Sequence, residues 1–373
     1  MNPQTIQTLL DKAVSDGAAP GLTAAILRPD GVHQFAAGVR GAADPRPMTA
    51  DSVFWIASCT KAITALAAGQ LVARGLLTLD EPIGERVPSL AIPKVLDGFD
   101  ADGKPRVRAA SRPITLRDLL THTSGLAYDF CNADLSRYFA ATGENLMSEP
   151  PTLVFDPGAG WQYGIGIDAA GWAIEAVTGQ GLDAYFAEHI LGPLGMGDTS
   201  FTPDAARSDR RAGMHVRGPD GAHIPVDPFP NAPQMWGGGG LTSTAPDYLK
   251  FLGAMITDGA GVAGPDTLAL LRDIQARQPA TGDLISSNPG FSHDFLPMPG
   301  IEKHWTLGFL RNAADVPGGR RAGSLAWGGI ANCYYWADPA SGVAGVMFAQ
   351  FLPFADPRMM ATFEAFEQAV YAD

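Results

Sequence analysis

Ser58-Cys59-Thr60-Lys61 opens a helical stretch that we expect to cover residues 57–75. The residues that follow, 62–72, are almost all small or apolar, as in a buried helix. Ser58 and Lys61 are three positions apart, so on a helix they share one face, with their Cβ atoms roughly 5–6 Å apart. A hydroxyl beside an amine at a helix N-terminus suits a serine nucleophile, because helix-end N–H groups stabilise nearby negative charge. Taken alone, the tetrapeptide also fits a capping serine followed by a solvated lysine.

The size and charge of the chain narrow the classes of protein to consider. At 373 residues, with 46% hydrophobic and 17% charged residues, it fits a globular enzyme of about two subdomains. A net charge of −13 and the lack of a basic block argue against nucleic-acid or anionic-membrane partners. No apolar run reaches the roughly 20 residues of a membrane span, and the N-terminus lacks the pattern of a signal peptide. Three cysteines in such a length favour a reducing compartment, so we expect a cytoplasmic protein.

Strand signals gather at the two ends of the chain. Near the N-terminus, Pro29-Asp30-Gly31 is a turn between two apolar segments, which predicts a β-hairpin. Near the C-terminus, strand-like segments occupy residues 305–309, 321–327, 333–338 and 343–349. Amphipathic helices are expected at both termini. We therefore predict an α+β fold (an α/β sandwich) whose antiparallel sheet is built from both chain ends and flanked by terminal helices.

A mainly helical domain is expected to be inserted between these ends. The sheet domain would comprise residues 1–80 and 300–373, the inserted domain residues 81–299, and the active site would lie at their junction. Within the insert, the pattern predicts helices at 115–122, 167–178, 182–191 and 244–256. Residues 82–112 are expected to be loop with short elements, and residues 200–235 and 275–300 to be irregular or weakly patterned.

Several kinds of active site have no support in the sequence. There is no G-x-S-x-G elbow of an α/β-hydrolase and no phosphate-binding loop. No H-E-x-x-H, paired C-x-x-C or EF-hand spacing occurs, so we expect neither a metal nor a cofactor. Among the scattered histidines, His122 stands in a Thr/Ser/Gly turn, which favours a turn-ordering role over that of a catalytic base.

A serine without a histidine partner needs another base. A lysine or a tyrosine can serve only if its pKa is lowered or its proton is shared with a neighbour. Tyr163 is a candidate because it lies in a glycine-rich turn just ahead of a helix, although a packed loop tyrosine fits this position too.

Trp327-Gly328-Gly329 is a third candidate element of an active site, after Ser58 with Lys61 and Tyr163. Two glycines let a substrate approach the backbone of a strand and let an N–H reach an oxyanion hole, but they also fit an ordinary β-bulge.

Together these features resemble the serine β-lactamase and penicillin-binding-protein fold, and within it the family VIII carboxylesterases and class C β-lactamase-like relatives. The matching segments follow in family order over nearly the whole chain: 58–61, 116–126, Tyr163 after Pro157-Gly158, 238–244 and 327–329. The resemblance implies that Ser58 is the acylated nucleophile, that Lys61 helps to deprotonate it, and that Tyr163 acts with Lys61 as general base and helps to activate water. It further implies an oxyanion hole formed by the backbone N–H groups of Ser58 and Ile330.

Two departures from the β-lactamase pattern bear on the substrate. Trp327 stands where a Lys-Thr-Gly motif has the lysine that holds a substrate carboxylate, and Trp-Gly-Gly is the form that the esterase members show. Ile165 stands where a Tyr-x-Asn motif has its amide. Both changes favour an apolar ester over a penicillin-like ligand. Trp327, Gly328 and Gly329 would line the acyl pocket, with Ile165 as an apolar wall and Tyr128 as an added hydroxyl.

The sequence thus predicts a serine carboxylesterase that cleaves small, short-chain esters through an acyl-enzyme and allows a weak β-lactamase side activity. Three alternatives stay open: an acyltransferase of the same fold, a β-lactamase or D-amino-acid peptidase, and a non-catalytic binding protein. The expected partner is a small-molecule ester, without nucleic acid or membrane. The sequence does not address the oligomeric state.

Overall fold

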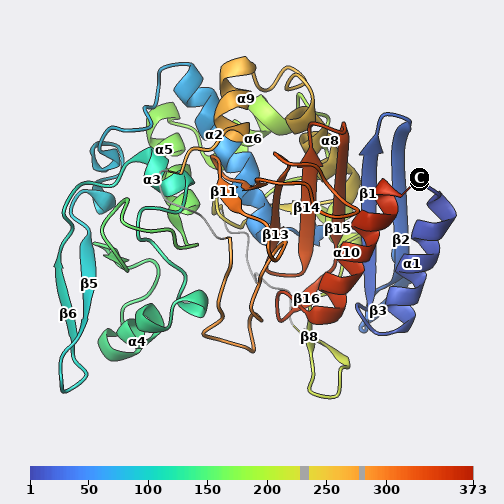
Figure 1. Ribbon diagram of the computed structural model, residues 1–373, viewed down its shortest axis with the longest axis horizontal. Coiled ribbons are helices and arrows are strands. Elements are labelled where there is room, and N and C mark those ends of the chain that lie inside the picture. Colours follow the sequence, from blue (N-terminus) through green and yellow to red (C-terminus); the bar gives the residue numbers. More distant parts are fainter. Residues whose placement is uncertain (227–234, 277–281, 373) are drawn as a thin grey trace.

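An eight-stranded antiparallel sheet forms the centre of the computed structural model, which describes residues 1–226, 235–276 and 282–372 (Figure 1). Its strands are, in spatial order, β11 (Lys303–Trp305), β12 (Leu310–Asn312), β13 (Leu325–Gly329), β14 (Cys333–Asp338), β15 (Val343–Phe348), β1 (Gly21–Arg28), β2 (Gly31–Gly41) and β3 (Asp44–Pro47). β1 pairs with β15, with Thr23 opposite Phe348. The two ends of the chain therefore meet in one sheet, which confirms the predicted fold class.

Helices cover both faces of this sheet. On β14, Tyr334 contacts Phe363 of α10 (Pro357–Tyr371), whereas its neighbour Tyr335 contacts Tyr248 of α8 (Ala245–Ile256). Successive strand residues point to opposite faces, so α10 and α8 lie on opposite sides. α1 (Pro3–Ser15) packs against α10. Because both faces are covered, the first six residues of β1 are all buried, which explains why its sequence alternates only weakly.

The helix announced by Ser58-Cys59-Thr60-Lys61 begins as a short 3-10 turn, η1 (Ala57–Cys59), and continues as α2 (Thr60–Ala73). α2 is buried around its whole circumference in its first three turns, which its run of alanines and small residues permits. It packs against α5 (Gly166–Thr178) and α9 (Pro265–Arg272). The helix carrying the candidate nucleophile is thus held by helices that come much later in the chain.

The remaining elements are short. The helices are η2 (Ile83–Glu85), η3 (Pro88–Leu90), α3 (Leu116–Leu120), η4 (Asp129–Cys131), α4 (Ala133–Thr142), α6 (Leu182–Phe186), the π-helical η5 (Ala187–Leu191) and α7 (Ala205–Asp209). The strands are β4 (Phe54–Trp55), β5 (Lys94–Phe99), β6 (Pro105–Ala109), β7 (Thr152–Leu153), β8 (His215–Arg217), β9 (His223–Pro225), β10 (Thr242–Ser243) and β16 (Phe351–Leu352).

Four segments differ in detail from what the sequence predicts. The strand expected at 305–309 is instead the connection between β11, which ends at Trp305, and β12, which begins at Leu310, and these two residues face each other in the pair. Residues 82–112 include a β-hairpin of β5 and β6, whose second strand is largely exposed and so lacks the apolar alternation of a buried strand. The helix expected at 182–191 changes from α to π after Phe186. The strand expected at 321–327 begins only at Leu325, because the backbone N–H groups of Arg321 and Ala322 donate to Asp338 and Asp315 instead.

In the part of the chain that is described, no helix combines the length and the apolar character needed to cross a membrane.

Candidate active site

Ser58 lies in the turn that links β4 to α2. The residue before it, Ala57, has a φ of +45°, a left-handed conformation that costs an alanine roughly 1–2 kcal/mol. The flanking structure keeps it there, since β4 pairs with β10 and the N–H of Ile56 donates to the carbonyl of Leu241. The strained turn places Ser58, which is partly exposed, at the wall of a cavity.

Lys61 reaches Ser58 from the first turn of α2. Its ammonium group is buried and donates to three acceptors. These are the Gly238 carbonyl at 2.6 Å, Tyr128 Oη at 3.0 Å and Ser58 Oγ at 3.3 Å. Three acceptors match the three hydrogens of an ammonium group. An uncharged amine in the same place would donate to the first two and accept from Ser58, so this geometry accommodates a proton moving from the hydroxyl to the amine.

Two tyrosines flank Lys61 at similar distances. Lys61 Nζ lies 5.0 Å from the ring centroid of Tyr163 and 5.2 Å from that of Tyr128. Burial, and then the nearby Asp168 carboxyl group, raise the pKa of Tyr128 well above its ordinary value, so Tyr128 is a neutral hydroxyl. Among the described residues, the buried Oη of Tyr163 has no hydrogen-bond partner. Tyr163 therefore has a hydroxyl free to meet a substrate or a water molecule.

His122 packs against Tyr163 and does not belong to the described lining of the cavity. Its φ is +57°, its carbonyl accepts from the N–H of Gln162, and its ring packs 4.8 Å from that of Tyr163. Both of its ring nitrogens are buried without a partner in the described part of the chain, and burial lowers the pKa of His122 well below its ordinary value. A neutral histidine under the tyrosine supports the expected structural role in the turn.

A glycine turn at residues 237–240 ties this site together. The hydroxyl of Thr64 donates to the Gly237 carbonyl at 2.6 Å, and the indole N–H of Trp55 donates to the Gly239 carbonyl at 2.7 Å. From α5, Asp168 Oδ1 accepts the N–H of Gly238 at 2.9 Å. Burial raises the pKa of Asp168 above its ordinary value, while Lys61 and the Gly238 N–H act in the opposite direction.

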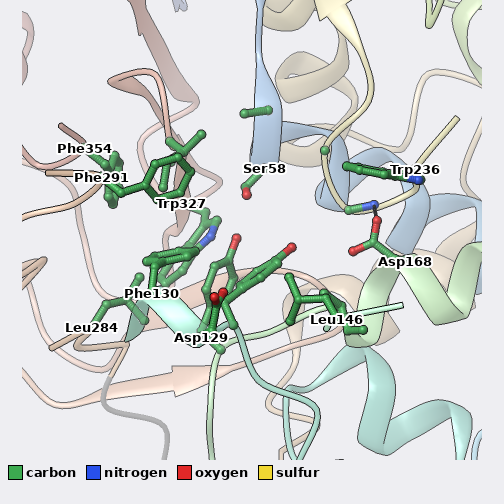
Figure 2. A pocket seen from close by; sticks show the side chains of 18 of the residues that line it. Ser58, Asp129, Phe130, Leu146, Asp168, Trp236, Leu284, Phe291, Trp327 and Phe354 are labelled. Carbon is green, nitrogen blue, oxygen red and sulfur yellow. Dashed lines mark hydrogen bonds between the residues drawn. The ribbon is translucent and has the colours of Figure 1, made fainter. Parts of the chain in front are cut away.

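The cavity in front of Ser58 has a volume of about 330 Å³ and is mostly apolar (Figure 2). In Figure 2, Phe130, Phe291 and Trp327 gather on one side of Ser58, and Leu146, Asp168 and Trp236 on the other. The carboxyl groups at its wall belong to Asp129 and Asp168, and no lysine or arginine belongs to the described lining residues. The lining comprises Trp55, Ala57, Ser58, Tyr128, Asp129, Phe130, Leu146, Met147, Tyr163, Ile165, Asp168, Trp172, Trp236, Gly238, Gly239, Leu284, Phe291, Trp327, Gly328, Ile330 and Phe354.

Most residues singled out from the sequence meet at this cavity. Trp327, Gly328, Ile330, Ile165 and Tyr128 all belong to its wall. Gly329 lies further back, against β4: a Cβ atom there would stand 2.2 Å from the Ile56 carbonyl oxygen. Gly329 thus permits close packing of β13 on the turn before Ser58 and is not itself part of the wall.

Other residues that line the cavity are not marked by the sequence motifs. Asp168 could have been noticed as an acidic residue in the first turn of an otherwise apolar helix. The aromatic wall residues Phe130, Phe291 and Phe354 stand in loops or one-turn helices without a periodic pattern. Their convergence depends on the tertiary fold, so no local signal marks them.

Comparisons with known proteins agree with this architecture. The profile of the beta-lactamase family matches residues 6–369. The chain is 34% identical over 350 residues to monacolin J acid methylbutanoyltransferase of Aspergillus terreus, covering 87% of this chain and 83% of that one. It is 31% identical over 402 residues to lovastatin esterase of Penicillium rubens, covering 98% of each. The structure of unliganded simvastatin synthase (LovD) of Aspergillus terreus superposes with a TM-score of 0.88 at 31% identity, covering 100% of this chain and 98% of that one. The chain belongs to the beta-lactamase family, among enzymes that include serine esterases and acyltransferases.

Proposed function

We propose that the protein is a serine carboxylesterase that cleaves small, apolar, short-chain esters through an acyl-enzyme on Ser58. One observation carries this proposal: Ser58 Oγ lies 3.3 Å from the buried Lys61 Nζ at the wall of an apolar cavity. A nucleophile within hydrogen-bond reach of a base is the arrangement that activates a serine.

In the acylation step, Ser58 Oγ attacks the ester carbonyl carbon while its proton passes to Lys61, acting with Tyr163. The N–H groups of Ser58 and Ile330 would stabilise the oxyanion that forms. Ser58 lies in the first turn of a helix, where N–H groups lack partners within the helix, and Ile330 follows β13 at the cavity wall. Collapse of the tetrahedral intermediate breaks the bond to the alcohol oxygen, which takes up the proton and leaves.

In the deacylation step, water attacks the acyl carbon of the Ser58 ester. The proton of the water passes to Tyr163 and Lys61 and from there to Ser58 Oγ as the acid is released. Two observations support this role of Tyr163. Its buried hydroxyl has no hydrogen-bond partner among the described residues, and the centroid of its ring lies 5.0 Å from Lys61 Nζ.

The cavity wall supports an uncharged, apolar ester as substrate. Its volume of about 330 Å³ is at the lower end of the range of small-molecule sites, roughly 300–1,000 Å³. Its acidic wall residues, where described, are Asp129 and Asp168, and none of the described lining residues is a lysine or arginine that could hold the carboxylate of a β-lactam. Trp327 also offers an apolar surface where a β-lactamase has a lysine. A weak β-lactamase side activity is compatible with the same nucleophile.

Acyl transfer to an alcohol is the second candidate. It is supported by the 34% identity to the methylbutanoyltransferase of Aspergillus terreus, whose name describes transfer of an acyl group. The aromatic wall disfavours water and favours an apolar acceptor. Both activities share the Ser58 acyl-enzyme and differ only in what reaches it.

We further propose that the two parts expected from the sequence meet at this site. Ser58 and Trp327 come from residues 1–80 and 300–373, whereas Tyr163 and Gly238 come from residues 81–299.

We also propose a cytoplasmic location. The three cysteines are unpaired thiols, which supports this location.

The test is a panel of p-nitrophenyl esters from acetate to octanoate, run beside nitrocefin, with and without an added primary alcohol. We expect the highest kcat/KM on the short esters and the formation of a new ester if transfer competes with hydrolysis. Ser58→Ala should abolish turnover and labelling by a fluorophosphonate, detected as a mass shift. Ser136→Ala, an exposed position on α4, serves as the matched control. Wild-type rates in Ser58→Ala, or nitrocefin turnover far above that of acetate, would refute the proposal.

A further inference from the structure

Asp168 is a buried carboxyl group next to the candidate catalytic residues, and the chemistry proposed above gives it no role. It stands in the first turn of α5, is 8% exposed, and lines the cavity beside Trp172 and Trp236. A carboxyl group in such surroundings is costly unless it is hydrogen-bonded. Its partners are a backbone group of the glycine turn and the hydroxyl of Tyr128.

A short chain of contacts leads from Asp168 to Lys61 through the backbone of a single residue, Gly238. Asp168 Oδ1 accepts the N–H of Gly238 at 2.9 Å, and the carbonyl of that same residue accepts from Lys61 Nζ at 2.6 Å. Of the three acceptors of Lys61, the Gly238 carbonyl is the nearest. The position of that carbonyl therefore sets the direction in which the amine points.

The backbone of Gly238 is packed tightly against the side chain of Asp168. A Cβ atom at Gly238 would stand 2.1 Å from Asp168 Oδ2, so the backbone of the turn is pressed against the carboxyl group. Thr64 holds the neighbouring Gly237 carbonyl from α2. The turn is thus fixed from the catalytic helix on one side and from α5 on the other, with Asp168 as the polar contact from α5.

We infer that Asp168 is a positioning residue of the Ser58–Lys61 pair: by holding the backbone N–H of Gly238, it fixes the carbonyl of the same residue and so keeps Lys61 Nζ in line with Ser58 Oγ. This inference rests on the proposed function. What it requires of Asp168 is a hydrogen-bond acceptor at the position of Oδ1, and not a negative charge. Displacement of reacting groups by about 1 Å is enough to cost an enzyme on the order of 10²-fold in rate.

The experiment compares Asp168→Asn, which keeps the acceptor, with Asp168→Ala, which removes it. We expect Asn to stay within about 3-fold of wild type in kcat on p-nitrophenyl butyrate, and Ala to lose about 10²-fold in kcat with little change in KM. The rate of Ser58 labelling by a fluorophosphonate should fall in parallel with kcat. Glu175→Ala is the matched control, because this carboxylate lies on the same helix and also accepts a backbone N–H, that of Leu182 at 3.0 Å, away from the site.

Each outcome decides the question. A full rate in Asp168→Ala would overturn the inference, and so would an Asn variant as slow as Ala, which would point to the charge. A purely structural role would lower the melting temperature without slowing the labelling of the folded fraction. If Asp168→Ala does not fold, Asp168→Ser retains a polar side chain that is too short to reach the peptide and should show the same loss. Failure of the proposed function would appear separately, as turnover in Ser58→Ala.

Discussion

At the scale of single residues, the two tyrosines beside Lys61 differ in the hydrogen bonding of their hydroxyl groups, because their surroundings differ. Both rings lie about equally far from the amine, and they lie 5.3 Å from each other. Tyr128 uses its oxygen to accept from Lys61, and its raised pKa keeps it protonated. Tyr163 has no such contact among the described residues, so we propose that its hydroxyl is the one that exchanges a proton with substrate.

This difference predicts unequal effects of removing the two hydroxyls. Tyr163→Phe should lower kcat by at least about 10²-fold, the low end for an acid–base group. Tyr128→Phe should lower it by less than about 10-fold, because a water molecule in the cavity can take over as acceptor for Lys61. Steady-state kinetics on one short ester check both variants. A larger loss in Tyr128→Phe than in Tyr163→Phe would reverse the assignment.

At the scale of elements, the glycine turn at 237–240 fastens α2 to the rest of the site. Thr60 Oγ1 accepts the N–H of Leu241 at 3.1 Å, and Thr64 Oγ1 donates to the Gly237 carbonyl at 2.6 Å. Both threonines are fully buried on α2. A helix of small residues gains little from side-chain packing at each position, so these polar contacts define where its first two turns lie.

Thr64→Val tests the strength of this fastening, because valine has nearly the same shape but cannot donate. The variant leaves the buried Gly237 carbonyl without its hydroxyl donor, which should lower the free energy of unfolding by about 1–3 kcal/mol. Urea unfolding measures the change. Thr257→Val, whose exposed hydroxyl donates to the Gly253 carbonyl at 2.9 Å, should stay within about 0.5 kcal/mol of wild type. Equal losses in the two variants would contradict the expectation.

At the scale of the whole molecule, α10 covers one face of the sheet in which the two ends of the chain pair. A buried ion pair between Arg320 and Glu367 ties α10 to the loop before β13. The carboxylate accepts the backbone N–H of Arg320 at 2.9 Å, its Nε at 2.8 Å and, in a third short contact, its Nη2. Burial alone would raise the pKa of Glu367, but the Arg320 guanidinium prevails and holds it below its ordinary value.

Glu367→Gln leaves the Arg320 charge buried without a counter-charge and should cost about 3–5 kcal/mol of unfolding free energy at pH 7. Because the folded pKa lies below the unfolded value, near 4.3, this stabilisation is fully present above pH 4.3 and is lost as the pH falls through the folded pKa. The gap between wild type and variant should therefore narrow in acid. Asp315→Asn, in the exposed pair with Arg321, is the control and should leave the free energy of unfolding close to that of wild type. An unchanged gap at low pH would rule out the ion pair as the cause.

The sequence by itself determined what depends on neighbouring residues. Spacing placed Ser58 and Lys61 on one helix face, turn residues marked the first hairpin, and the pattern at 115–122 marked α3, which the structure begins with a capping box of Thr115 and Asp118. The order of short motifs along the chain revealed the family resemblance, and with it Tyr163 and Trp327. Each motif lies within a few residues, and the order of the motifs can be read along the chain without knowledge of the fold.

Only the tertiary structure decided how these parts act on one another. The contact of Lys61 with Tyr128 spans 67 positions, that of Asp168 with Gly238 spans 70, and that of Lys61 with Gly238 spans 177. Contacts this distant leave no periodic trace, because each partner obeys the rules of its own turn or helix. For the same reason, the residues around Tyr128 do not show that its hydroxyl accepts from Lys61, and the local sign of Asp168, a carboxyl group on an apolar helix, does not show what it contacts. The packing of α5 and of the glycine turn against α2 brings these groups together, and the low polarity of the cavity they share gives each contact its strength.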